Sequence, residues 1–141
     1  MELRTPGIEE YDEILELWER CDITYRPDGR DSREHVASEL NESPEYWIAA
    51  YEDGDLVGIV VGSDDGRKGW VNRLAVHPRY RREGIASSLL EALESAFEDN
   101  GLRVFAALIE DDNDRSQAFF EAFEYDDSSI VYYSKRENEF V

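Results

Sequence analysis

The chain of 141 residues carries 34 Asp and Glu against 15 Lys and Arg, a formal charge of −19, and 41% of its residues are apolar. This length predicts a single domain over residues 1–141, and the aromatic share of 12% excludes an acidic disordered segment, a class poor in aromatics. The negative charge argues against nucleic-acid binding, because nucleic-acid phosphates are met by Lys and Arg.

The basic residues are 13 Arg and only 2 Lys. Together with the many carboxylates, this composition resembles that of proteins from organisms that keep molar salt in the cytoplasm. Salt at about 1 M screens charges beyond about 3 Å and so relieves self-repulsion. The alternative is an acidic surface that attracts cationic substrates.

Neither a disulfide nor a membrane anchor is expected. Cys21 is the single cysteine, and no apolar run approaches the roughly 18 residues of a membrane span. The N-terminus lacks the basic and apolar parts of a signal peptide. The sequence therefore predicts a cytoplasmic protein without membrane contact.

Segments whose apolar residues have helical periodicity alternate along the chain with segments that have strand periodicity. The first is a short extended segment at Glu2–Thr5. Apolar residues then recur at a spacing of about 3.6, which predicts an amphipathic helix, at Ile8, Tyr11, Ile14, Leu15 and Trp18. A second, weaker helix is predicted over Ser32–Leu40. Both helices precede the main strands.

Three strands follow in succession. Tyr46–Tyr51 and Asp55–Gly62 are joined by a hairpin turn in which Gly54 supplies a positive φ. After a polar turn at Ser63–Gly69, a third strand is predicted at Trp70–Val76.

The most regular helix of the chain begins after Gly84 and ends at Asn100-Gly101. Its apolar residues stand at four-residue steps: Ile85, Leu89, Leu93 and Phe97. The remaining elements are a strand, a short helix behind an Asn113 cap, and a last strand, at Arg103–Ile109, Asp114–Phe123 and Ile130–Lys135. The order β-α-α-β-β-β-α-β-α-β is that of a mixed α/β domain.

The acidic character of the chain is interrupted once. Between Gly66 and Arg82 no carboxylate occurs, although about four would be expected from the overall frequency. The basic residues of this stretch are Arg67, Lys68, Arg73, Arg79, Arg81 and Arg82. A positive segment on a negative protein indicates an anionic ligand, and the alternative is that these residues pair with acids elsewhere in the fold.

This basic segment ends where the regular helix begins. A helix N-terminus presents unpaired N–H groups and a partial positive charge, so phosphates bind there readily. Gly84 lets the backbone approach a ligand without a Cβ in the way, and Arg81 and Arg82 can add charge-assisted hydrogen bonds. The sequence therefore predicts a diphosphate site at residues 81–86.

Two motifs carry a resemblance to a known family. Arg81-Arg82-Glu83-Gly84-Ile85-Ala86, after Leu74-Ala75-Val76-His77-Pro78, resembles the acetyl-CoA loop of the GNAT superfamily of N-acetyltransferases, Gln/Arg-x-x-Gly-x-Gly/Ala after hydrophobic-x-Val-x-Pro. Asn113-x-x-Ser116-x-x-Phe119-Phe120 resembles the distal pattern of the same family. A weaker likeness, Leu17-Trp18-Glu19-Arg20-Cys21-Asp22, points to an uncharacterised prokaryotic branch.

The resemblance implies a fold of the α/β (α+β) class, with a mixed central sheet of about six to seven strands and about four helices. Strands four and five, Trp70–Val76 and Arg103–Ile109, would separate at a bulge, and the arm of acetyl-CoA would lie between them. The residues implied to bind acetyl-CoA are Leu74, Ala75, Val76, Arg81, Arg82, Glu83, Gly84, Ile85, Ala86 and Asn113.

The implied reaction is direct attack of a primary amine, from a small molecule or a peptide, on the thioester of acetyl-CoA. Many family members use a distal-helix Tyr as the acid, but the matching residue is Phe120, and no carboxylate stands on strand four. Glu110 and Tyr132 are the predicted substitutes, with a water held by Asp111 as a further option. No metal is expected.

The loss of both usual catalytic groups leaves two alternatives open: a catalytically degenerate acyl-CoA-binding or regulatory module, and a structural subunit. A homodimer is a further expectation, because dimers are frequent in the family. Four aromatic residues either line an acceptor pocket or belong to the core: Trp18, Tyr25, Trp47 and Tyr51.

Overall fold

The computed structural model describes residues 1–141 and contains one sheet of five strands in the order β1-β2-β3-β4-β5. Successive strands are antiparallel up to β4, and β5 is parallel to β4. The strands are β1 (Glu2–Arg4), β2 (Trp47–Glu52), β3 (Asp55–Asp64), β4 (Gly69–Val76) and β5 (Phe105–Ala107).

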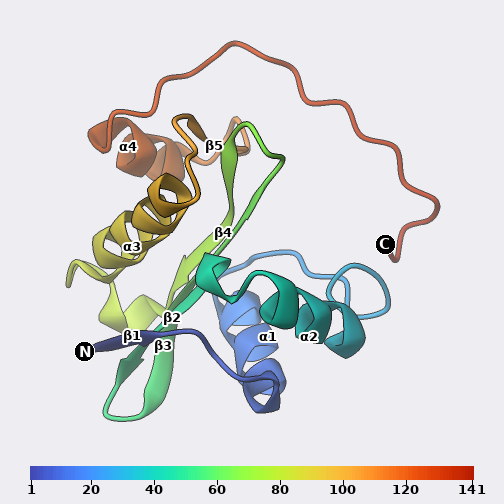
Figure 1. Cartoon of the computed structure of the whole chain (residues 1–141), viewed down its shortest axis with the longest axis vertical. Coiled ribbons are helices and arrows are strands. Elements are labelled where there is room, and N and C mark those ends of the chain that lie inside the picture. The colour runs from blue at the N-terminus through green and yellow to red at the C-terminus, as the bar shows by residue number, and fades with distance from the viewer.

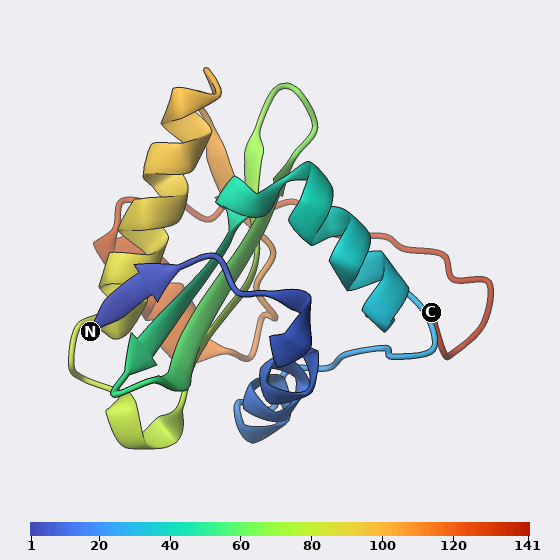
Figure 2. The ribbon, with the colours of Figure 1, turned by 60° about the horizontal axis from the view of Figure 1, so that its bottom comes forward.

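Four α-helices flank the sheet: α1 (Tyr11–Arg20), α2 (Arg33–Glu42), α3 (Ile85–Asp99) and α4 (Asp114–Ala122). Three short 3₁₀ turns complete the elements: η1 (Ile8–Glu10), η2 (Pro44–Tyr46) and η3 (Pro78–Tyr80). Helices α1 and α2 cover one face of the sheet, and α3 and α4 cover the other (Figure 1, Figure 2). None of these helices combines the length and the apolar character that a membrane span needs.

The apolar stripe predicted for α3 is buried against the sheet. Ile85, Leu89, Leu93 and Phe97 are at most 2% exposed and belong to one core cluster with Val60 of β3. The helix lies close to the sheet because glycines face it: a Cβ at Gly69 would lie 2.5 Å from the Phe97 ring.

A second core cluster joins α1 and α2 to the opposite face. Trp18, Trp47 and Tyr51 are at most 3% exposed in this cluster, so they are core residues. Tyr25 is the exception among the four aromatics considered from the sequence, because it is half-buried in the loop between α1 and α2.

The expectation of six to seven strands is wrong, because the sheet has five. The predicted last strand, Ile130–Lys135, forms no strand. β-Branched and aromatic residues favour an extended chain there, but a strand also needs a hydrogen-bonded neighbour. This segment instead runs in a long arc away from the sheet edge, with Tyr133 88% exposed (Figure 1).

The strand predicted at Arg103–Ile109 shortens to Phe105–Ala107, and the cause lies in β4. Val61 of β3 faces Arg73, whereas its neighbour Gly62 faces Val71, so Asn72 is an extra, bulged residue. Pairing of β4 with β5 ends at Val71 and Ala107. Beyond the bulge, Asn72–Val76 continues without β5, so the predicted separation of these two strands is present.

Candidate functional site

The loop from Arg81 to Ala86 joins η3 to α3. Its backbone turns twice through the left-handed region, at Arg82 with a φ of 67° and at Gly84 with a φ of 80°. A Cβ built on Gly84 would meet no atom within 4 Å, so the loop surface at this residue is open. Arg82, Glu83 and Gly84 are exposed, whereas Ile85 is buried and anchors the helix start.

Consecutive backbone N–H groups are free along this loop. None of the amides from Arg81 to Ala86 donates a hydrogen bond within the chain; the first hydrogen bond at the start of α3 is from Ser88 N–H to Gly84 C=O, 3.1 Å. Successive free amides in a segment with left-handed turns form a concave anion-binding surface, and the helix dipole adds positive potential. The loop can therefore hold a diphosphate.

The edge of β4 beyond the bulge presents further backbone groups. His77 N–H donates to Val57 C=O at 2.8 Å, so the alternation of an antiparallel pair turns the N–H and C=O groups of Leu74 and Val76 away from β3. Ala75 faces β3 instead. The Val76 carbonyl already accepts from Arg81 Nε at 3.2 Å.

Cys21 contacts the same carbonyl, with its Sγ 3.4 Å from Val76 O. Burial raises the pKa of the Cys21 thiol, and the nearby Arg81 guanidinium offsets only part of this increase. The thiol is thus kept neutral and serves as a weak donor at the end of β4.

Asn113 and Phe120 belong to α4 and its N-terminal cap, on the same side of the sheet as α3. The Asn113 side chain accepts from Ser116 N–H at 3.1 Å, so it caps α4. Phe120 is 7% exposed and packs edge-on against Phe119 and Tyr125, with ring centroids 5.3 Å and 5.1 Å away. Phe120 therefore belongs to the core between α3 and α4.

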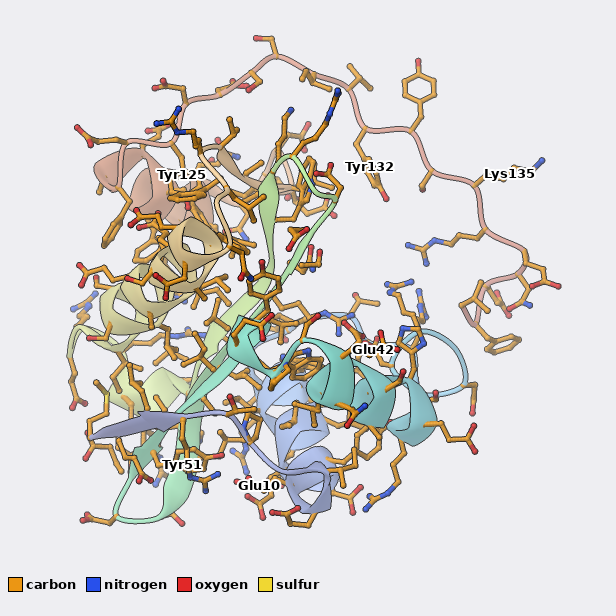
Figure 3. All side chains as sticks on the ribbon, viewed as in Figure 1. Glu10, Glu42, Tyr51, Tyr125, Tyr132 and Lys135 are labelled. Carbon is orange, nitrogen blue, oxygen red and sulfur yellow. The ribbon has the colours of Figure 1, made fainter.

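The two predicted proton-transfer residues, Glu110 and Tyr132, lie in different segments of the chain. Glu110 is exposed three residues after the end of β5, and its carbonyl accepts from Asn113 N–H at 3.0 Å. Tyr132 is 67% exposed on the C-terminal arc (Figure 3). Glu110 thus lies at the start of α4, beside the Asn113 cap, whereas Tyr132 lies on the exposed arc.

A shallow cavity of about 470 Å³, largely open to solvent, lies on the α1 side, at the end of that helix. Two carboxylates, an aromatic ring and two smaller side chains line it: Glu19, Asp22, Ile23, Thr24 and Tyr25. Tyr25 donates to Glu19 at 2.5 Å. Another cavity, of about 360 Å³, lies at the C-terminal end of α3, about 20 Å from the loop, and takes no part in the site.

Sequence reasoning missed one pair beside this cavity. Arg73 of β4 binds Asp31 of the α1–α2 loop through two contacts, 2.5 Å and 2.9 Å. The two residues are 42 positions apart, and no local pattern joins them. The sequence held one signal for this pair. No Asp or Glu stands near Arg73 in the sequence, so its guanidinium needed a partner from a distant segment.

The chain matches the model of a protein family described as the acetyltransferase (GNAT) family over residues 11–125. A Sodalis glossinidius protein named acetyltransferase is 34% identical over 137 residues, 96% of this chain and 95% of that protein. A Pectobacterium atrosepticum protein, also named acetyltransferase, is 32% identical over 136 residues, with the same shares covered.

Solved structures share the fold. The PaiA N-acetyltransferase from Thermoplasma acidophilum in complex with coenzyme A has a TM-score of 0.76 at 19% identity, covering 86% of this chain and 87% of that one. AAC(6')-Iy in complex with the bisubstrate analogue CoA-S-monomethyl-acetylneamine has a TM-score of 0.76 at 18% identity, covering 96% and 97% of the two chains.

Proposed function

Because the chain belongs to the GNAT family of acetyltransferases, and is therefore an acyltransferase, we propose that it transfers the acetyl group of acetyl-CoA to the primary amine of a small cationic molecule. The free amides from Arg81 to Ala86 carry the proposal. Unpaired N–H groups at a helix start favour an anion such as a diphosphate, and these groups lie at the end of the only long stretch without carboxylates.

The remaining contacts with acetyl-CoA follow from the separation of β4 and β5. The outward N–H and C=O groups of Leu74 and the N–H group of Val76 can bind the amide-containing arm of acetyl-CoA as a strand would, because β5 leaves that edge of β4 free. Asn113, at the start of α4, is the further residue proposed to contact the arm. The fold itself is shared with a coenzyme A complex, which supports this assignment.

The acceptor side is the face that carries α1 and α2. The cavity there contains Glu19 and Asp22, which favour a cationic molecule. A structure of the same fold binds an analogue joining CoA to an acetylated neamine, which supports a small amine as the acceptor class. A cytoplasmic location stays a prediction of the sequence.

The transfer forms a bond between the amine nitrogen and the acetyl carbon and breaks the bond between that carbon and sulfur. Backbone N–H groups at the Asn72 bulge are suited to stabilise the oxyanion, because this needs no particular side chain. Phe120 has no proton to give, and a lost general acid costs about 10²–10⁴-fold in rate. A thiol with a pKa of about 8.5 leaves without full protonation, which reduces that cost.

The amine must lose a proton before it attacks. At pH 7 a lysine-like amine with a pKa near 10.4 lies about 3.4 units from its neutral form, whereas an α-amine near 7.7–8 lies about 1 unit away. An amine of low pKa is therefore the better acceptor for this site. Glu110 and Tyr132 stay the predicted proton-transfer residues, alongside bound water.

The donor site is tested by Gly84→Glu. A carboxylate on the loop about 4 Å from a diphosphate charge costs about 4 kcal/mol at an effective dielectric constant of about 20, which is roughly a 10³-fold loss of affinity. Titration calorimetry with CoA measures this loss. Gly66→Glu is the matched control: Gly66 also has a positive φ, 83°, and open space around its Cβ, but it lies in the β3–β4 hairpin.

The control must bind CoA as the wild type does, and both variants must keep the far-UV spectrum. Equal CoA affinity for Gly84→Glu and Gly66→Glu contradicts the diphosphate assignment. Thiol release from acetyl-CoA, measured across polyamines, aminoglycosides and amino acids at low and high KCl, then identifies the acceptor. Tight CoA binding without thiol release from any amine favours the alternative of an acyl-CoA-binding or regulatory module, for which the buried Phe120 is the supporting observation.

A further inference from the structure

Arg73 stands on β4 directly after the bulge that separates β4 from β5. Its side chain crosses to the α1 side, where the guanidinium carbon lies 4.3 Å from the centroid of the Trp18 ring. Nη1 and Nη2 bind the two oxygens of Asp31 at 2.5 Å and 2.9 Å. The side chains of Arg73 and Asp31 are only 16% and 7% exposed, so this ion pair is largely shielded from water.

The same two residues hold the α1–α2 loop at several points. Arg73 Nη2 donates to the Thr24 carbonyl at 3.2 Å. The Asp31 carboxylate also accepts from Arg26 N–H at 2.7 Å, and the Asp31 carbonyl accepts from the Tyr11 hydroxyl at 2.5 Å. Burial alone would raise the pKa of Asp31, but the hydrogen bonds from Arg73 and Arg26 lower it by a larger amount. The pKa of Asp31 is therefore below its ordinary value, and the carboxylate stays ionised in the folded protein.

This loop is also the wall of the 470 Å³ cavity, because Ile23, Thr24 and Tyr25 line it. The pair therefore connects the cavity wall to the strand residue next to the bulge. The family pattern predicts a carboxylate on the strand that corresponds to β4. In this chain β4 carries Arg73 instead, and Arg73 binds the Asp31 carboxylate of the α1–α2 loop. That carboxylate is engaged by a guanidinium and a backbone N–H, so it orients other groups and does not accept a proton.

We propose that Arg73 and Asp31 are positioning residues for the amine acceptor: their ion pair holds the loop from Asp22 to Asp31 against β4, so that the cavity wall and the reacting end of the donor site keep a fixed separation. The inference rests on the proposed function, in which the donor occupies the β4 edge and α3 side and the acceptor approaches from the α1 side. Neither residue touches the reacting atoms.

The test uses Asp31→Asn, Arg73→Lys and Arg73→Met. Asparagine keeps the shape of Asp31 without its charge, and lysine keeps the charge of Arg73 without the two-pronged geometry. Arg67→Met is the matched control, because Arg67 belongs to the same basic stretch but is exposed in the β3–β4 hairpin and makes no ion pair.

Two measurements are made on the full chain. Hydrogen exchange reports opening of residues 24–31, and steady-state kinetics reports KM for acetyl-CoA and for the best amine of the screen. We expect Asp31→Asn and Arg73→Met to speed exchange of the loop about tenfold or more, while α3 stays protected. The KM for the amine should rise about 10- to 100-fold and the KM for acetyl-CoA less than about twofold, with Arg73→Lys in between.

Unchanged loop exchange in Asp31→Asn overturns the proposal, and so does an equal rise of both KM values, because a merely structural role would weaken both substrates together. If Arg73→Met does not fold, Asp31→Asn and Arg73→Lys decide alone. A wild type that binds no CoA and releases no thiol overturns the proposed function, and with it the acceptor role; normal wild-type transfer with unaffected variants overturns only the inference.

Discussion

Glu10 and Asp31 are the buried carboxylates of a protein that has 34 acidic residues. Glu10 accepts hydrogen bonds from the Tyr51 hydroxyl at 2.7 Å, from Gly7 N–H at 2.9 Å and from Arg4 at 3.1 Å. Figure 3 shows Glu10 and Tyr51 side by side where β1 leads into α1. This network ties the end of β1 and the turn η1 to the neighbouring strand β2.

The electrostatics of the two partners follow from this contact. Burial raises the pKa of Glu10, but the hydrogen bonds from Tyr51, Gly7 and Arg4 lower it by more, so its pKa lies below the ordinary value. Burial and the neighbouring Glu10 raise the pKa of Tyr51 well above its ordinary value. At neutral pH the pair is a carboxylate with a neutral phenol donor.

Glu10→Gln tests this residue. A carboxyl whose pKa is lowered by folding stabilises the protein above its unfolded pKa, about 4.3, and this stabilisation is lost as the pH falls through the lower folded value. We expect the variant to lose about 1–3 kcal/mol of unfolding free energy at pH 7, and less at pH 3.5. Urea unfolding at both pH values measures the difference, and exposed Glu121→Gln serves as control. A deficit of equal size at both pH values would contradict the role of the charge.

At the scale of elements, α3 and β4 decide where the proposed donor site lies. The apolar stripe of α3 packs on the sheet over residues that have no side chain, because Cβ atoms at Gly62 and Gly69 would lie 2.8 Å from Leu93 and 2.5 Å from Phe97. Close packing fixes the axis of α3, and thus the position of its N-terminal amides relative to the edge of β4.

Gly69→Ala tests this packing. The added methyl group must displace the Phe97 ring, which is fully buried, so we expect a loss of about 1–3 kcal/mol in unfolding free energy. Phe97→Leu removes the opposing ring, and the double variant should be more stable than the sum of the single effects predicts, because the two sites share one space. Chemical denaturation of the four proteins provides the cycle. Strict additivity would show that the helix does not press on this glycine.

For the whole molecule, the charge of −19 is the dominant property. Five ion pairs and one contact between His35 and Glu39 form, and only the pair between Arg73 and Asp31 is largely buried on both sides. Most carboxylates therefore face water and each other. Their repulsion disfavours the compact state at low ionic strength.

We therefore expect the melting temperature to rise with KCl, because the Debye length falls from about 10 Å at 0.1 M to about 3 Å at 1 M. The matched variant carries Glu91→Gln, Glu98→Gln and Asp99→Asn, three exposed acids of α3. It should melt higher than the wild type at low salt and gain less from KCl. Scanning calorimetry measures both, and parallel salt curves for the two proteins would rule out self-repulsion as the cause.

Features of short range were predictable. The helix that starts at Gly84, the basic loop before it and the Asn113 cap of α4 each occupy a few consecutive residues, and hydrogen bonds or periodicity within those residues define them. The edge of the sheet was not predictable in this way. Ile130–Lys135 has the residue types of a strand, yet whether such a segment pairs depends on a neighbour far away in the chain.

By itself, therefore, the sequence determined the loop and helix start of the proposed donor site, since a glycine, two arginines and a helix start are adjacent in the chain and act through local backbone geometry. Tertiary structure alone decided the proposed acceptor side. There Arg73 meets Asp31 across 42 positions, and a charged side chain takes whichever opposite charge the packing of α1 and β4 brings within reach, which no spacing along the chain encodes.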